Sequence, residues 1–261
     1  MPPTEPSADP GPLSVTELTD RPGQLLGGDV EDTLDLRLPD DFLASLSEGP
    51  GAATLSEEAA VWAGTEPVTG RADLLDGVGA WGPTVTSAGV FQLVPVHLGR
   101  DLPLVVRWMN DPAVAAFWEL AGPPRVTEQH LRQQLAGDGR SVPCLGLLDG
   151  SPMSYWEIYR ADLDPLARHY PARPHDTGVH LLIGGVADRG RGLGGTLLRA
   201  VADLALDNRP ACARVVAEPD LRNTPSVSAF LTAGFRFAAE VDLPGKRAAL
   251  MIRDRCLRHL L

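Results

Sequence analysis

A glycine-rich stretch in the last third of the chain, "DRGRGLGG" at residues 188–195, places the strongest constraint on the fold. It follows an apolar segment, "VHLLIGGV", and precedes an amphipathic one, "TLLRAVADLAL". Backbone N–H groups of such a loop can converge on an anion, and the dipole of the following helix adds partial positive charge. The pattern therefore predicts an α/β protein in which a strand, this loop and a helix form a phosphate-binding site.

Two familiar phosphate-binding loops are alternatives for this stretch, one of which fails on its motif and the other on the surrounding topology. A nucleotide-triphosphate loop requires Gly-Lys-Ser/Thr, and the stretch contains no lysine. The dinucleotide pattern G-x-G-x-x-G is matched by Gly190, Gly192 and Gly195, and Glu218 ends the next expected strand, where an acidic residue would contact a ribose. However, too few residues follow Glu218 to complete a doubly wound sheet, and the preceding half lacks alternating strand and helix units.

A third template is the pyrophosphate loop R-x-x-G-x-G of the GNAT acyltransferases, which Arg189, Gly192 and Gly194 match. The order of the expected elements agrees with this template along the whole region. The motif alone is weak, because glycines also serve tight turns, but the motif combined with the order of elements favours this reading over the other two.

Charge and composition narrow the class of protein. The formal net charge of -11 disfavours a nucleic-acid partner, which would require a basic surface. Residues 1–90 carry 16 acidic and 3 basic residues, and residues 91–261 carry 18 acidic and 20 basic ones, so the second region can still hold an anion. No apolar segment reaches the roughly 20 residues of a membrane span, and the N-terminal residues lack the pattern of a signal peptide. We therefore expect a cytoplasmic protein with no membrane partner.

The chain divides into three parts. Residues 1–30 are rich in Pro, Gly, Asp and Glu and are predicted to be a disordered tail. Residues 31–90 form an acidic extension, in which residues 33–39 alternate like a short strand and residues 40–50 resemble a short helix. Residues 91–261 form the α/β domain.

The domain has clear turn and helix signals. Residues 91–96 are expected to be a strand, followed by helical segments over 100–120 that break at Asn110-Asp111-Pro112. Asp149-Gly150 predicts a tight hairpin turn. The segments that follow are a strand, the glycine loop, a helix, a strand ending near Glu218, a helix that Gly234 closes, and two final strands.

Several stretches resemble the GNAT-type N-acyltransferases of hydroxamate siderophore pathways, including those of aerobactin, alcaligin, desferrioxamine and mycobactin. The resemblance covers Phe91 to Arg255 and is carried by "SYWEIYRADLDPLARHYPARPHDTGVHLLIG", "GRGLGGTLLRAV", "RVVAEPDLRN" and "GFRFAAEVDLPGKRAALM". It implies a mixed central sheet flanked by helices and a reaction that moves an acyl group from acyl-CoA, with acetyl or succinyl as the group, to the side-chain amine or hydroxylamine of lysine, ornithine or a related diamine such as cadaverine. It implies no metal.

The resemblance also implies that His180 and Glu218 are the catalytic pair. From the residues alone, His180 in an apolar strand would more often be a hydrogen-bonded core residue. As a general base it would take the proton that the attacking nitrogen loses. Glu218 could accept a proton, orient His180 or hold the substrate nitrogen, or it could simply pair with Arg214 or Arg222 at the surface.

The expected cofactor contacts are the backbone of the strand before the loop, the loop itself and an asparagine that begins the next helix: Leu181, Leu182, Ile183, Arg189, Gly190, Arg191, Gly192, Leu193, Gly194, Gly195 and Asn223. The expected acceptor contacts are Trp156, Glu157, Arg173, Asp176 and Lys246, although alternation along "YWEIY" is also explained by sheet packing. Three scattered cysteines and two loop histidines, His169 and His175, lack metal-ligand spacing, so no metal site is predicted.

Three other functions remain open at this stage. The first is a GNAT enzyme that acts on an unrelated amine, such as an antibiotic or a protein terminus. The second is a non-catalytic acyl-CoA-binding module, and the third is a dinucleotide-dependent oxidoreductase. A homodimer is compatible with the sequence but is not indicated by any residue in it.

Overall fold

The computed structural model describes residues 75–260, and the strand and helix expected at 33–39 and 40–50 lie outside this range. An eight-stranded mixed sheet forms the centre, in the order β1-β2-β3-β4-β5-β6-β8-β7. Every neighbouring pair is antiparallel except β5 and β6. The strands are β1 (Thr84–Thr86), β2 (Gly89–Pro95), β3 (Ser141–Leu148), β4 (Ser151–Arg160), β5 (Thr177–Ile183), β6 (Arg214–Ala217), β7 (Arg236–Leu243) and β8 (Lys246–Asp254).

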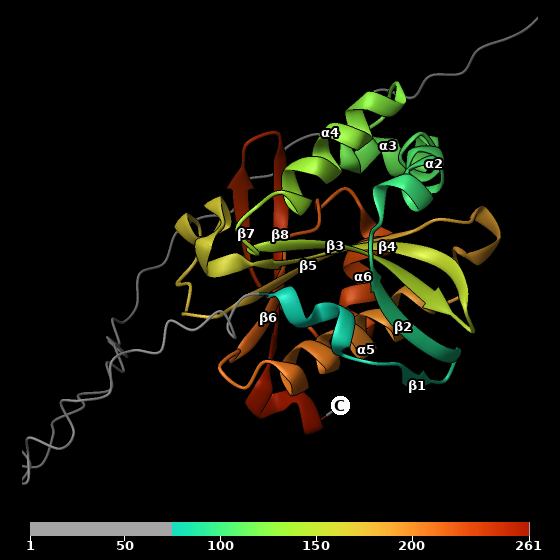
Figure 1. Cartoon of the computed structure of the whole chain (residues 1–261). Coiled ribbons are helices and arrows are strands. Elements are labelled where there is room, and N and C mark those ends of the chain that lie inside the picture. The colour runs from blue at the N-terminus through green and yellow to red at the C-terminus, as the bar shows by residue number, and fades with distance from the viewer. Residues whose placement is uncertain (1–74, 261) are drawn as a thin grey trace, which may run out of the picture. The chain divides into compact units, whose positions relative to one another are not determined.

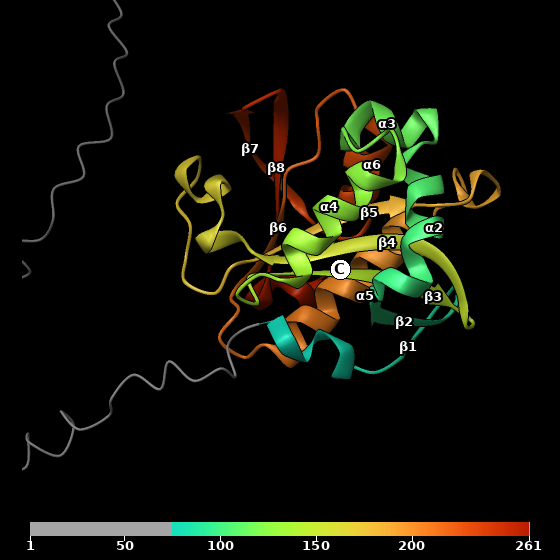
Figure 2. The same ribbon diagram turned by 45° about the horizontal axis from the view of Figure 1, so that its top comes forward.

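Helices cover both faces of the sheet. In Figures 1 and 2, α2, α3 and α4 lie on one side of the central strands, and α5 lies on the other. The helices are α2 (Leu98–Met109), α3 (Pro112–Trp118), α4 (Pro124–Leu135), α5 (Leu193–Asn208) and α6 (Thr224–Thr232). Short 3-10 helices connect them: η3 (Leu75–Ala80), η4 (Ala161–Leu163), η5 (Pro165–Arg168), η6 (Val186–Asp188) and η7 (Arg255–Leu260). No helix of the described residues is long and apolar enough to cross a bilayer.

The turn and the helix break predicted from the sequence are found at the expected residues. Asp149 and Gly150 both have positive φ, 48° and 78°, and join β3 to β4 in a two-residue turn. The helical segment after β2 ends at Met109, and α3 begins at Pro112 with the Asp111 side chain accepting a hydrogen bond from the Ala113 N–H. The hairpin turn and the break between the two helical segments, both predicted from the sequence, are confirmed.

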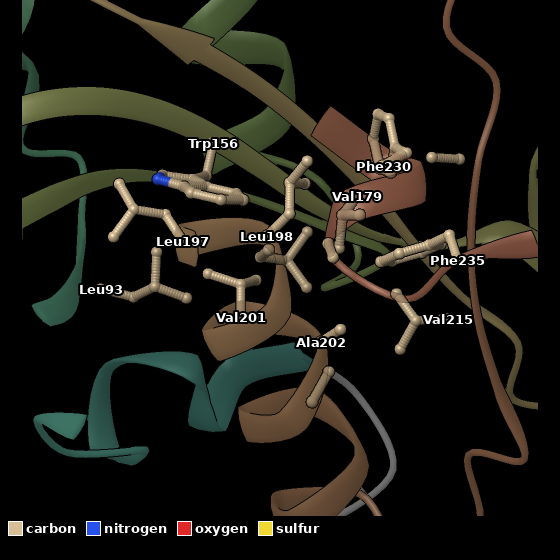
Figure 3. Close-up of a cluster of buried hydrophobic side chains, with 14 of the residues drawn as sticks. Leu93, Trp156, Val179, Leu197, Leu198, Val201, Ala202, Val215, Phe230 and Phe235 are labelled. Atoms are coloured by element: carbon tan, nitrogen blue, oxygen red, sulfur yellow. The ribbon is translucent and has the colours of Figure 1, made fainter. Parts of the chain in front are cut away.

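The larger core lies between the sheet and α5. Figure 3 shows Leu197, Leu198 and Val201 of α5 on the side of the helix that faces Trp156 of β4 and Val179 of β5, with Ala202 farther along the helix toward Val215 of β6, and all of these side chains are buried. Helical spacing places these residues on one side of α5, where Leu204 and Ala205 are buried as well. This packing makes α5 a fixed support for the glycine loop that precedes it.

The opposite face of the sheet has its own core. Tyr155 and Leu182 pack there with Val105 of α2 and Leu131 of α4. Because side chains alternate along a strand, Tyr155, Glu157 and Tyr159 of β4 share this face, while Trp156 and Ile158 point toward α5. Helices α2, α3 and α4 therefore cover the same face of β4 on which Glu157 lies.

Residues 75–90 belong to the sheet and its core, although the sequence analysis assigned them to the acidic extension. Leu75 and Val78 of η3 are 1% exposed and pack in the same cluster as Phe91. Strand β1 extends the sheet by pairing with β2, from Thr84 opposite Phe91 to Thr86 opposite Gly89. Weak sequence periodicity concealed this element, because β1 is only three residues long.

Strands β5 and β6 separate shortly after they meet. Their parallel pairing consists of Thr177 with Val215 and Gly178 with Val216, whereas β5 stays paired with β4 as far as Ile183. His180 lies on β5 just beyond the last β6 pair, and Glu218 directly follows β6. The carboxyl ends of separating parallel strands are a usual place for ligands in open α/β sheets.

Candidate active site

The structure brings His180 and Glu218 into direct contact. The His180 Nε2 lies 2.5 Å from Oε1 of Glu218, and the second carboxylate oxygen of Glu218 accepts a 2.7 Å hydrogen bond from the Tyr159 hydroxyl. Glu218 is thus not paired with Arg214 or Arg222, which form ion pairs with Asp176 and Asp220 instead. The two residues named by the resemblance face one another across the split between β5 and β6.

A second carboxylate holds the other side of the imidazole. The His180 Nδ1 lies 2.9 Å from Oε2 of Glu157, which is directly opposite His180 in the antiparallel pairing of β4 and β5. The other oxygen of Glu157 accepts hydrogen bonds from three donors, which are Tyr155 at 3.0 Å, Gln134 at 2.6 Å and His130 at 2.6 Å. A buried carboxylate needs such donors to remain ionised.

The flanking carboxylates determine the charge of His180. Burial by itself would lower its pKa, but the negative charge of Glu218 and hydrogen bonds to Glu157 and Glu218 raise the pKa of His180 to about 10. Burial would raise the pKa of Glu218, but the charge of His180 dominates and lowers it to about 2. Burial opposes the ionisation of Glu157 as well, yet hydrogen bonds from His130 and His180 hold its pKa well below the usual range. At neutral pH the group is therefore an imidazolium between two carboxylates.

Lys246 and Tyr159 complete the surroundings of Glu218. The Lys246 Nζ donates a 2.7 Å hydrogen bond to the Glu218 carbonyl oxygen and lies 3.5 Å from its Oε1. Burial and the adjacent carboxylate raise the pKa of the Tyr159 hydroxyl well above its ordinary value, so it remains a donor. The Tyr159 ring also packs on His180, with ring centroids 4.8 Å apart.

A cavity of about 430 Å³ opens onto these groups. His130, Glu157, His180, Glu218 and Lys246 all line it. Its walls come from the end of α3, from α4, from β4 and β5, from the segment after β6 and from α6: Phe117, Trp118, Glu119, Leu120, Val179, Leu181, Ala217, Pro219, Asp220, Asn223, Ser226 and Phe230. We call this space the acceptor cavity.

A second cavity of about 590 Å³ surrounds the glycine loop and the start of α5. It shares residues with the acceptor cavity, namely Phe117, Trp118, Leu181, Asn223 and Ser226. Most of the expected cofactor contacts line it: Leu181, Leu182, Ile183, Arg189, Gly190, Gly192, Leu193, Gly194, Gly195 and Asn223. We call this space the loop cavity.

The loop glycines have two different reasons to be glycine. Gly190 and Gly192 have positive φ, 72° and 77°, which a residue with a β-carbon rarely adopts. Gly195 instead lies against α6, where an added β-carbon would come within 3.0 Å of Cγ2 of Thr232. The glycines therefore shape the loop backbone and allow α5 and α6 to approach closely.

The two loop arginines do not direct their charges into the loop cavity. The Arg189 guanidinium donates to the carbonyl oxygens of Ile183 and Gly184 and forms an ion pair with Asp111 at 2.8 Å. Arg191 is exposed and is not among the residues that line the loop cavity. The loop therefore offers backbone N–H groups to an anion.

The expected acceptor residues divide into two groups. Glu157 and Lys246 line the acceptor cavity, but Trp156, Arg173 and Asp176 line neither cavity. Trp156 is fully buried against α5, with its indole N–H donated to Ser154, because strand alternation turns it to the opposite face from Glu157. This location corrects the expectation that Trp156 faces the acceptor.

Asp176 and Arg173 lie elsewhere for a different reason. Asp176 is completely buried and paired with Arg214, while also accepting hydrogen bonds from the Tyr170 hydroxyl and the Arg173 backbone N–H. The Arg173 side chain is exposed. These two residues hold the loop between β4 and β5 in place.

Sequence reasoning missed three residues of the site. Tyr159 could have been found, because it shares a strand face with Glu157. Trp118 forms part of both cavities, and its ring centroid lies 6.0 Å from that of His180. His130 comes from α4, and no local signal in the sequence brings that helix to β4.

Comparison with known proteins agrees with this geometry. A model described as an acetyltransferase (GNAT) domain matches residues 97–243, which is more than half of the chain. The chain belongs to the GNAT acetyltransferase family. The GNAT interpretation of the sequence is therefore confirmed over the dinucleotide interpretation.

Curated relatives and a solved structure show how close this GNAT domain is to others. A lysine N-acyltransferase from Mycolicibacterium paratuberculosis is 38% identical over 164 residues, which cover 63% of this chain and 73% of the relative. An N(6)-hydroxylysine O-acetyltransferase from Escherichia coli is 38% identical over 155 residues, 59% of this chain and 49% of the relative. The crystal structure of an uncharacterised Bacillus halodurans protein matches with a TM-score of 0.65 and 31% identity, over 69% of this chain and 92% of that one.

Proposed function

We propose that this GNAT enzyme uses acyl-CoA to acylate the N-hydroxylated side-chain nitrogen of lysine, ornithine or a diamine such as cadaverine, forming a hydroxamate for siderophore biosynthesis. The observation that carries the proposal is the His180 imidazolium, held between Glu157 and Glu218 where the acceptor cavity meets the loop cavity. The named relatives support the same substrate class. Acetyl and succinyl are the acyl groups we propose to test.

The loop cavity is suited to CoA. Its backbone N–H groups at the start of α5 favour the negative pyrophosphate, and the dipole of a 16-residue helix adds to that attraction. The edge of β5 beyond Gly178 is not paired with β6, and Leu181, Leu182 and Ile183 line the cavity there. We propose that this edge binds the thioester carbonyl and polarises it for attack.

The charge of the site favours an acceptor nitrogen that arrives neutral. Both ring nitrogens of His180 face carboxylates, so the imidazole offers no lone pair, and Glu218 is too acidic to deprotonate an ammonium. A lysine side chain is an ammonium at neutral pH, with an ordinary pKa of about 10.4. An N-hydroxyl group withdraws electron density and leaves the nitrogen neutral and nucleophilic. Hydroxylation before acylation is therefore part of the proposal.

The reaction needs one displacement within a ternary complex. The acceptor nitrogen attacks the thioester carbonyl carbon, the new C–N bond forms, and the C–S bond breaks with its electron pair leaving on sulfur. The nitrogen becomes strongly acidic as it bonds to carbon, so Glu218 can accept its proton despite its low pKa. One proton leaves nitrogen and one finally joins sulfur, giving the hydroxamate and free CoA thiol. We propose that His180 orients Glu218 rather than acting as a free base.

The test measures CoA release together with product mass. Purified protein receives acetyl-CoA or succinyl-CoA and each of N6-hydroxylysine, N5-hydroxyornithine, N-hydroxycadaverine and their unhydroxylated parents. We expect one hydroxylamine to be acylated and its parent amine to react at least about 100-fold more slowly, and we expect His180→Ala to remove most of the activity.

Two results would contradict the proposal. Equal turnover of an unhydroxylated parent would show that the site can neutralise an ammonium. Tight CoA binding without turnover of any acceptor would contradict the acceptor class and favour either an unrelated amine or a non-catalytic acyl-CoA-binding module. The non-catalytic module predicts that His180→Ala and Glu218→Ala leave both CoA binding and the physiological output of the protein intact, whereas an enzyme acting on an unrelated amine would lose that output.

A further inference from the structure

The acceptor cavity is lined by four carboxylates, Glu119, Glu157, Glu218 and Asp220. Glu157 and Glu218 share the charge of His180. Asp220 is paired with Arg222, whose Nη2 lies 2.7 Å from its Oδ2. Three of the four carboxylates therefore already have a positively charged partner.

Glu119 differs from the other three. Within residues 75–260 its carboxylate forms no hydrogen bond or ion pair, and the side chain is exposed at the cavity wall. Glu119 ends α3 in a left-handed conformation, with φ of 52°, which is uncommon for a residue other than glycine. Its Oε1 lies near the turn between β7 and β8, 3.8 Å from the position of a β-carbon on Gly245. Among residues 75–260, Glu119 is thus the carboxylate of the cavity wall that has no positively charged partner.

We propose that Glu119 binds the second, positively charged amino group of the acceptor and thereby selects acceptors that carry one. This inference rests on the proposed function, because it assumes that the reacting nitrogen lies beside Glu218. Lysine-like and ornithine-like acceptors carry an α-ammonium, and a diamine carries an ammonium at its far end. A simple alkylhydroxylamine has the same reacting group and no second charge.

The expected energetic effect lies in binding. A carboxylate distant from the reacting nitrogen contacts the ammonium equally in the ground state and in the transition state, so its loss raises KM and leaves kcat unchanged. An exposed ion pair contributes little, whereas a charge-assisted hydrogen bond in a partly enclosed cavity contributes more. We expect an effect of about tenfold, which decreases as salt increases.

The experiment compares two acceptors and two enzymes in one cycle. The acceptors are N-hydroxycadaverine and N-hydroxypentylamine, which differ only in the second amino group. The enzymes are the wild type and Glu119→Gln. The amide keeps the size of the side chain and removes its negative charge. We expect the substitution to lower kcat/KM for N-hydroxycadaverine about tenfold through KM and to leave N-hydroxypentylamine unchanged. The wild type should prefer N-hydroxycadaverine by a similar factor.

A matched control is Glu128→Gln, which removes a half-buried carboxylate of α4 that is paired with Arg132 and lies outside the acceptor cavity. This control should leave kcat/KM unchanged for both acceptors.

An equal loss of kcat/KM for both acceptors in Glu119→Gln, or no loss for either, overturns the proposal. If the wild type acylates neither acceptor, the proposed function fails. The role of Glu119 is then tested separately by calorimetry, which compares the affinities of cadaverine and pentylamine for the complex of the enzyme with CoA. A tighter cadaverine complex that Glu119→Gln weakens supports the assignment, and equal affinity rejects it.

Discussion

The acceptor cavity and the loop cavity share residues such as Trp118 and Leu181 but differ in the chemical groups that they offer to a ligand. In the acceptor cavity, ionised side chains from several elements face one another, with His180 between Glu157 and Glu218. In the loop cavity, the nearest arginine side chain is engaged by Asp111 and by backbone carbonyls, and the backbone itself is left to bind an anion.

This difference predicts how each cavity responds to mutation. The acceptor cavity depends on which side chains are present and on their charges. Replacing one carboxylate by an amide should therefore affect catalysis without affecting the fold of the loop. The loop cavity depends on backbone conformation. The substitutions that affect it are therefore those that replace a glycine whose conformation other residues rarely adopt.

The largest expected effect comes from Glu218→Gln. The amide keeps the size of the side chain but cannot accept a proton as a carboxylate does, so kcat should fall by about 10² to 10⁴-fold. The dissociation constant of CoA should remain the same, because Glu218 does not line the loop cavity. Steady-state kinetics and CoA calorimetry measure the two quantities.

A suitable control for that substitution is Glu240→Gln on β7. Its side chain is 43% exposed, is paired with Arg247, and lines neither cavity, so both quantities should be unchanged. If Glu218→Gln instead weakened CoA binding and catalysis equally, the two cavities could not be treated as separate.

The fold was largely predictable because its signals are local. Asp149-Gly150 fixes the hairpin, the residue before Pro112 ends a helical segment, and apolar spacing in α5 identifies its buried stripe. Each signal depends on residues a few positions apart. The short strand β1 was missed because three residues are too few to show a period.

The site was less predictable because its contacts join distant segments. Strand alternation places Trp156 and Glu157 on opposite faces of β4, but it does not reveal which face opens into a cavity. Asp176 finds its partner Arg214 38 positions away, and that pairing removes it from any contact with the acceptor. The catalytic assignment of His180 came from the resemblance, and the two carboxylates that determine its charge became evident only in the structure.

A smaller effect should appear in the dependence of stability on pH. The folded protein raises the pKa of His180 from an ordinary value near 6.5 to about 10, so the charged imidazole stabilises the fold fully below pH 6.5. That contribution is lost as pH rises toward 10. About a third of the imidazole is exposed, and screening by solvent limits the expected loss to about 2 kcal/mol.

Chemical denaturation at pH 6, 8 and 10 measures this loss. The wild type should lose more stability over the range than His180→Gln, which has no ionisable group at this position. His169→Gln alters an exposed histidine and should follow the wild type. Parallel curves for the wild type and His180→Gln would mean that His180 is not held as an imidazolium.

The smallest effect, and the one that tests the loop cavity directly, is expected from Gly192→Ala. Gly192 has φ of 77°, and Gly150 in the turn between β3 and β4 has φ of 78°, and an added β-carbon at either position meets no atom within 4 Å. Gly150→Ala is therefore a matched control for strain. Each substitution should lower the free energy of unfolding by about 1 kcal/mol, because a β-carbon disfavours the left-handed conformation.

Only one of the two substitutions should affect the ligand. Relief of the strain in Gly192→Ala turns backbone N–H groups away from the anion, and we expect the dissociation constant of CoA to rise about tenfold, while Gly150→Ala leaves it unchanged. Denaturation and CoA calorimetry on both variants measure the two effects. Equal CoA affinity in both variants, at equal loss of stability, would show that anion binding does not depend on the loop conformation, and the contrast between the cavities would fail on that side.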